Sequence, residues 1–203
     1  CGSCSAVCPS GAITYDAPPV ETLFRRLSTL ASTYRKSGGQ AARLLVHDAI
    51  FGAEMIALAA RFGRGLPADV IPLEVDALSG FGHAEMLAAF GCGFERVDIL
   101  ISPRAELDVI EAQTELAKAL SGGDAIRLLQ PADPDALSAL LYTDLDAPAR
   151  IEPILPVGSR RQVTRLAAKA LQPDAGVIDL PEHAPYGAVL VDTDACTLCL
   201  SCV

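Results

Sequence analysis

The chain has 203 residues, of which 51% are hydrophobic, so it can bury one good-sized core or two small ones. Its net charge of -9 and pI near 4.7 argue against a nucleic-acid-binding surface. No apolar run is long enough for a membrane span, and no signal peptide is recognised, so we expect a cytoplasmic protein without a membrane span.

The first feature is a run of cysteines, Cys1, Cys4 and Cys8, with Pro9 directly after the third. Two or three residues between thiolates allow a tight loop to present successive sulfurs to one metal centre. We therefore interpret residues 1–16 as the first half of a metal-binding module.

The central part of the chain predicts an α/β domain. Residues 17–42 predict a linker helix at about 19–37, and residues 43–145 alternate apolar runs with helical patterns. In chain order we expect strands at 43–49, 69–76, 97–102 and 124–129, and helices at 50–63, 83–91, 105–120 and 133–142. This alternation predicts a three-layer domain with a parallel sheet, of Rossmann-like or flavodoxin-like topology, and helices on both faces. Pro72 favours an edge strand or a bulge for the second strand.

Residues 146–186 predict a second linker, with a helix at 159–171 that begins after the N-cap Ser159. The helix carries a basic stripe, which is either a solvated face or a docking surface for an acidic redox partner: Arg160, Arg161, Arg165 and Lys169. Short strands are expected at 176–180 and at 187–192.

A second cysteine run ends the chain, with Cys196, Cys199 and Cys202 each separated by two residues. The bacterial ferredoxin motif is C-x2-C-x2-C-x3-C-P. The first run matches its last three cysteines and the second run matches its first three, so we expect motifs truncated at both ends, as in a fragment of a longer protein. Residues 187–203 are thus interpreted as the second half of the module.

Both runs, with the flanking Ser10-Gly-Ala-Ile and Val191-Asp192, resemble dicluster ferredoxins that carry two 4Fe–4S clusters. In that family the fourth cysteine of each run binds the other cluster. The resemblance implies that Cys196, Cys199 and Cys202 share one cluster with Cys8. Cys1 and Cys4 would belong to a second cluster whose other ligands are missing, so this chain holds at most one complete cluster.

Two other interpretations of the cysteines remain open. The Cys-x2-Cys pairs are compatible with a structural zinc site. A disulfide framework is compatible with an oxidising compartment. The combination of a triple run with Cys-x3-Cys-Pro favours the iron–sulfur interpretation over both.

Residues 43–120 also resemble, weakly, the delta subunit of methyl-viologen-reducing hydrogenase, through Leu66-Pro-Ala-Asp-Val-Ile-Pro-Leu-Glu-Val-Asp and Val97-Asp-Ile-Leu-Ile-Ser. That family places cysteines at its strand ends. Here the corresponding positions are His47-Asp48, Ala77 and Ser102-Pro103, with Cys92 alone remaining, so the resemblance implies a shared shape without those ligands.

The first functional hypothesis is electron transfer by 4Fe–4S clusters, with the α/β domain inserted between the two halves of a ferredoxin-like module. The partner would be a redox protein such as a hydrogenase or a formate dehydrogenase. No nucleophile–base–acid constellation is found, so a carrier is favoured over an enzyme. The alternatives are a ligand-binding, nucleotide-binding or catalytic crevice beside His47, Ala77 and Ser102, fed by the clusters, or a docking scaffold.

Overall fold

A parallel sheet forms the centre of the molecule. The computed structural model describes residues 2–8, 11–15, 18–143, 152–187 and 191–197. The strands are β1 (Arg43–Asp48), β2 (Val70–Val75), β3 (Arg96–Leu100) and β4 (Ile126–Leu129), in the parallel order β2-β1-β3-β4. The predicted α/β class and its parallel sheet are confirmed.

The strand pattern agrees with burial on two faces. In the inner strand β1, Leu44, Leu45 and Val46 are all fully buried, although successive side chains point to opposite faces. The edge position of β2 tolerates Pro72, which is exposed and lacks the backbone N–H of other residues. The expectation of an edge strand or a bulge at Pro72 is thus met by an edge strand.

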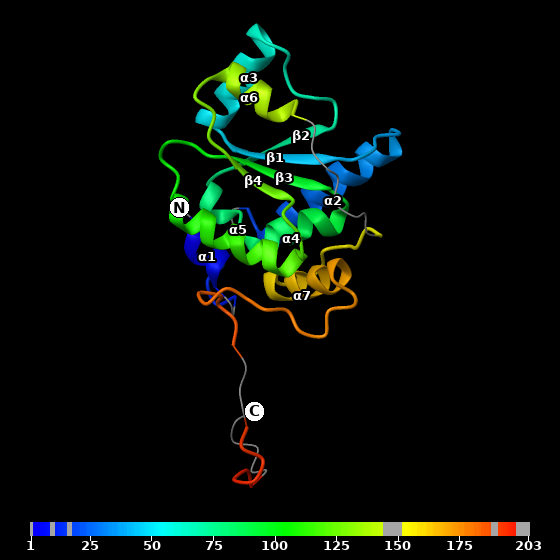
Figure 1. Cartoon of the computed structure of the whole chain (residues 1–203), viewed down its shortest axis with the longest axis vertical. Coiled ribbons are helices and arrows are strands. Elements are labelled where there is room, and N and C mark those ends of the chain that lie inside the picture. The colour runs from blue at the N-terminus through cyan, green and yellow to red at the C-terminus, as the bar shows by residue number, and fades with distance from the viewer. Residues whose placement is uncertain (1, 9–10, 16–17, 144–151, 188–190, 198–203) are drawn as a thin grey trace.

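One face of the sheet is covered by α3 (Phe51–Phe62) and α6 (Pro134–Leu141), which lie above it in Figure 1. Their contact buries a cluster of apolar side chains: Leu45, Met55, Val70, Leu100, Leu129, Leu137 and Leu141. The start of α6 is fixed by Asp133, whose carboxylate accepts a hydrogen bond of 2.7 Å from the Ala136 N–H.

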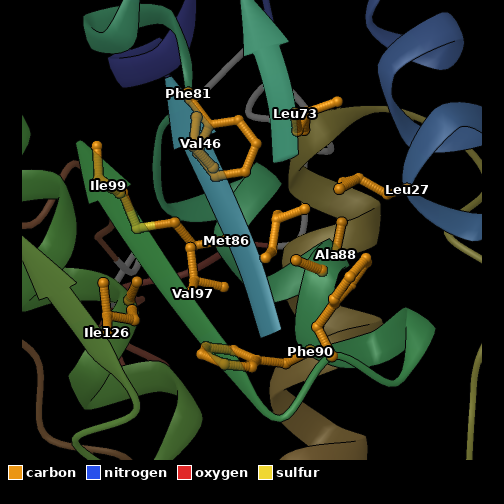
Figure 2. Packing of buried hydrophobic residues seen from close by; sticks show 14 of the residues in the cluster. Leu27, Val46, Leu73, Phe81, Met86, Ala88, Phe90, Val97, Ile99 and Ile126 are labelled. Atoms are coloured by element: carbon orange, nitrogen blue, oxygen red, sulfur yellow. The ribbon is translucent and has the colours of Figure 1, made fainter. Parts of the chain in front are cut away.

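The opposite face carries α2 (Val20–Lys36), α4 (His83–Cys92) and α5 (Leu107–Ser121), as Figure 1 shows. Figure 2 shows this packing, in which Met86 of α4 and Leu27 of α2 join Val46 in the larger core cluster. A further helix, α7 (Arg160–Leu171), covers the outer side of α4, so that all ten residues of α4 are buried. None of the described helices is long and apolar enough to cross a membrane.

Some short elements differ from those expected from the sequence. The structure contains a short helix, α1 (Ser3–Val7), within the first cysteine run, and a 3-10 turn, η1 (Leu78–Gly80), after β2. The expectation of a strand at 176–180 is wrong, because these residues do not pair with any strand of the sheet. Of the strand expected at 187–192, residues 187, 191 and 192 are not in a strand, and 188–190 lie outside the described residues.

Both segments that were interpreted as linkers contribute to the packed body. The helix α2 buries Phe24, Leu27 and Ala31 in the larger core cluster. The helix α7 buries Val163 and Ala167 against the same side of the domain. The sequence between the cysteine runs therefore forms a broader layer of helices on this face than the expected strand–helix alternation alone would supply.

Candidate functional site

The predicted ligands divide into described and undescribed residues. Cys4 is exposed in α1, Cys8 follows that helix and is half-buried, and Cys196 is exposed; all three carry thiols rather than disulfides. The other three expected ligands, Cys1, Cys199 and Cys202, lie outside the described residues. Among the residues that the structure does describe, no group of three His, Cys, Asp or Glu side chains is arranged to hold a metal ion.

The first cysteine run is tied to the body through α1. Ser5 and Ala6, which lie between Cys4 and Cys8, are 2% and 1% exposed. The Ser5 hydroxyl accepts a hydrogen bond of 2.6 Å from the Nη1 atom of Arg160. A charged donor on α7 therefore fixes the backbone that presents the two thiols.

Arg160 is itself held by a buried carboxylate on α4. Its Nε atom donates to Glu85 Oε1 at 2.5 Å, and Glu85 is 0% exposed. The second oxygen, Oε2, accepts from the Gly82 N–H at 3.0 Å and so closes the N-terminus of α4. Burial raises the pKa of Glu85, while the Arg160 guanidinium and the Gly82 N–H oppose that change.

The residue before α4, Gly82, lies where α1 and α5 meet. A Cβ atom added to Gly82 would come within 2.8 Å of Gln113 Oε1 and 3.0 Å of Ala6 Cβ. The backbone of Gly82 has φ -91°, which other residues adopt, so the close approach rather than the dihedral angle requires glycine.

The C-terminal segment is tied to the same end of α4 through His83. Nδ1 of His83 donates to Gln113 Oε1 at 2.6 Å, and Nε2 accepts from the Tyr186 hydroxyl at 2.5 Å. The rings of His83 and Tyr186 also meet edge to face at 5.6 Å. Burial lowers the pKa of His83, the positive charge of Arg160 lowers it further, and the hydrogen bond to Gln113 acts in the opposite direction. Burial and Arg160 therefore both favour the neutral form of the His83 imidazole.

These residues form one unit, which we call the α4 hub: Gly82, His83, Glu85, Gln113 and Arg160. The hub binds α1 at Ser5 and Ala6, and it binds the C-terminal segment at Tyr186. In Figure 1 the described segment 191–197, drawn in red near the C-terminus, lies away from the α/β body.

Arg160, which was expected in the basic stripe on α7, is separated from that stripe in the structure. Arg160 turns inward to Glu85 and Ser5, whereas Arg161, Arg165 and Lys169 are exposed. The sequence did contain a signal for the role of Glu85. Glu85 lies three residues after Gly82, where α4 starts, and this is the spacing of a helix cap. No local signal indicated the partner, because Arg160 lies 75 residues from Glu85.

A separate crevice lies at the carboxyl ends of β1, β2 and β3, where the strand order reverses. It has a volume of about 280 Å³ and is lined by Asp48, Asp76, Ala77, Ser79 and Ser102, among others. Burial would raise the pKa of Asp48, but hydrogen bonds from the Gly52 N–H, the Ser102 hydroxyl and neighbouring backbone N–H groups lower it.

His47, which was expected at the crevice, does not line it. The residue is buried, its Nδ1 lies 2.9 Å from the Asp48 carbonyl oxygen, and α3 packs against it so closely that Gly52 has no room for a side chain. His47 therefore has a structural role in joining β1 to α3.

Cys92, the last residue of α4, is 2% exposed. Burial raises the pKa of the Cys92 thiol to about 12, and the nearby Arg35 offsets only part of that effect. A thiol in this state is a poor nucleophile. Gly93, which follows Cys92 at φ 101°, ends α4 in a left-handed turn.

Comparison with known proteins gives no assignment: no family model, no curated protein and no solved structure matches this chain.

Proposed function

We propose that the chain transfers electrons through a 4Fe–4S cluster held by Cys8, Cys196, Cys199 and Cys202. The observation that carries the proposal is the pair of ferredoxin-spaced cysteine runs at opposite ends of the sequence. Thiolate sulfur is the donor that such clusters require, and Cys8 and Cys196 are in the thiol form. A cluster bound there would accept and release one electron at a time.

The α4 hub supports the proposal because it anchors the approach to both runs at one place. Cys8 lies two residues after the anchored Ala6, and Cys196 lies ten residues after the anchored Tyr186. Ten residues of extended chain reach about 33–36 Å. The tether beyond Tyr186 is therefore long enough for Cys196 to approach Cys8 without any rearrangement of the α/β body.

The proposal includes a redox protein as partner and a reducing compartment such as the cytoplasm, because thiolate ligands must remain reduced. The role of the α/β body is to hold the two ligand sets at one end of α4. Arg160 would position the Cys4–Cys8 loop through Ser5, and His83 would position the second segment through Tyr186.

The decisive experiment is anaerobic reconstitution followed by iron, sulfide and zinc analysis, with EPR after reduction. We expect about four irons and four sulfides per chain and the signal of a reduced 4Fe–4S cluster. The ligand assignment makes a sharper prediction: Cys8→Ser and Cys196→Ser lose the cluster, whereas Cys4→Ser retains it.

Cys92→Ala is the matched control, since it removes a buried thiol that is not among the proposed ligands, and it should retain its iron. Stoichiometric zinc, or no metal after reconstitution of the wild-type chain, would overturn the proposed function. Loss of iron in Cys4→Ser together with retention in Cys8→Ser would overturn the ligand assignment alone.

A second candidate function is ligand binding in the crevice lined by Asp48, Ser79 and Ser102. The specific observation in its favour is the position of this cavity at the reversal point of a parallel sheet, where such folds bind small molecules. Titration calorimetry with ATP, NADH and FMN tests it. Binding that Ser102→Ala weakens at least tenfold supports this candidate, and no binding at millimolar concentration rejects it for these three ligands.

A further inference from the structure

The exposed side of α7 carries a row of like charges. Arg161, Arg165 and Lys169 follow one another at four-residue spacing, so they lie along one face, and all three are exposed. The helix contains no acidic residue. In the part of the chain that the structure describes, no carboxylate forms an ion pair with any of these three side chains.

This arrangement is unfavourable for α7 by itself. Like charges four residues apart on a helix repel each other and destabilise it. By contrast, the exposed cation Lys118 on α5 pairs with Asp124. The chain has a net charge of -9, yet this row of cations has no acidic partner among the described residues. The row therefore does not contribute to the stability of the fold.

Apolar side chains lie next to these cations. Leu166, on the same side of α7, is 44% exposed, and Val157, just before the helix, is 64% exposed. Protein-binding surfaces combine exposed apolar side chains with charged ones in this way. We define the α7 cationic face as Arg161, Arg165, Leu166 and Lys169.

The α7 cationic face also begins next to the first cysteine run. Arg161 directly follows Arg160, which donates its hydrogen bond to Ser5 between Cys4 and Cys8. A protein bound along α7 would therefore lie beside the loop that carries these two cysteines.

We propose that the α7 cationic face docks an acidic redox protein, and this inference rests on the proposed electron-transfer function. Charge complementarity selects the partner: two acidic proteins repel each other over most of their surfaces, and an orientation that opposes this cationic face reduces that repulsion. The bound carrier takes one electron from the reduced cluster, which returns to its oxidised state.

The test uses oxidised flavodoxin, a small acidic electron carrier, as the defined partner. Calorimetry measures its affinity for the chain at about 20 and 200 mM salt. Stopped-flow absorbance measures the one-electron reduction of flavodoxin to the semiquinone by chain that has been reduced with dithionite and then freed of excess dithionite. We expect both affinity and rate to fall with salt. The variant Arg161→Glu/Arg165→Glu/Lys169→Glu should lose at least tenfold in both.

The matched control, Arg25→Glu/Arg61→Glu/Arg104→Glu, makes the same change of net charge at exposed positions outside α7 and should lose less than threefold. Equal losses in both variants, or no loss in either, would overturn the docking surface. Circular dichroism checks that both variants fold.

Iron analysis of the same samples separates the two proposals. A chain that holds no iron but binds flavodoxin through α7 retains the docking surface and rejects the proposed function. A chain that holds iron and reduces flavodoxin at a rate that the α7 substitutions do not change retains the proposed function and rejects the docking surface.

Discussion

The ion pair between Glu85 and Arg160 joins α4 to α7 within the α4 hub. Glu85 is fully buried on α4, and Arg160 is its charged partner within 2.5 Å. Such a pair adds little net stability over an apolar replacement, but removal of one partner leaves an uncompensated buried charge. The structural consequence of the pair is specificity: it fixes α7 against α4 and α1 in one register.

Replacement of Arg160 by Met should therefore destabilise the chain by about 3–5 kcal/mol, because the Glu85 carboxylate loses its cation and its hydrogen bond. Urea denaturation followed by circular dichroism measures the change. Arg161→Met, one residue further along α7 and exposed, should change stability by less than about 0.5 kcal/mol. Similar losses in the two variants would contradict the assigned role of Arg160.

His83 makes the stability of the α4 hub depend on pH. Its pKa is lowered from 6.5 in the folded chain by burial and by Arg160, within an environment that also contains Glu85 and Tyr186. As the pH falls below about 6.5, the unfolded chain takes up a proton at this residue more readily than the folded chain does. Stability that is present at pH 7 is therefore lost as the pH falls towards 5.

Substitution His83→Gln supplies one donor and one acceptor without a titrating group. We expect it to reduce the slope of unfolding free energy against pH between 7 and 5, by at most about 1.4 kcal/mol per pH unit. Denaturation midpoints at several pH values give this slope. His183→Gln, at an exposed position, is the control and should leave it unchanged; an unchanged slope in His83→Gln would show that the imidazole is not held neutral.

At the scale of secondary structure, the contact between α1 and α4 depends on the absence of a side chain at Gly82. We expect Gly82→Ala to destabilise the chain by about 1–3 kcal/mol, because the added methyl group would overlap Ala6 and Gln113. Gly123→Ala, where an added Cβ atom meets nothing within 4 Å, is the control and should be nearly neutral. Urea denaturation compares the two, and equal effects would show that α1 is not packed tightly at this point.

The elements of the α/β body were predictable because each carries its own local pattern. The strand Arg43–Asp48 is a continuous apolar run, and the helix Arg160–Leu171 begins after Ser159, whose hydroxyl and backbone N–H both pair with Gln162. The charged groups of the interior were not predictable in the same way. Asp98 is buried in β3 and pairs with Arg127 on β4, and Glu85 pairs with Arg160 on α7. Each of these partners is specified by tertiary packing rather than by local sequence.

The short helix α1 was missed for a related reason. Five residues have too little length to show a helical period, and an isolated helix of that size is not stable. Its stability comes from Ser5 and Ala6, which are buried against the body. The spacing of Cys4 and Cys8 was visible in the sequence, but the surface that holds them was not.

At the scale of the whole molecule, the proposed cluster requires two distant parts of the chain to meet. Closure of a loop costs free energy that grows with the logarithm of its length. The α4 hub replaces the long path between Cys8 and Cys196 with a short one, from Ala6 to Cys8 and from Tyr186 to Cys196. The shorter path lowers the closure cost by about 2 kcal/mol. The α/β body thus makes assembly of the split site more favourable, whether or not it has a ligand of its own.

A cluster shared by the two ends of the chain should change the segment 191–197, all of which is exposed and without helix or strand in the structure. In the metal-free chain its amide protons should exchange with solvent rapidly, because no regular structure protects them. When iron and sulfide are bound, the same amides should be protected, since Cys196 is then fixed near Cys8. Hydrogen–deuterium exchange with mass spectrometry compares the two states, and Cys8→Ser treated with iron and sulfide is the control that should remain unprotected. Equal protection in Cys8→Ser and wild type would show that the C-terminal cysteines bind metal without the first run, and a site shared between the two ends would then be rejected.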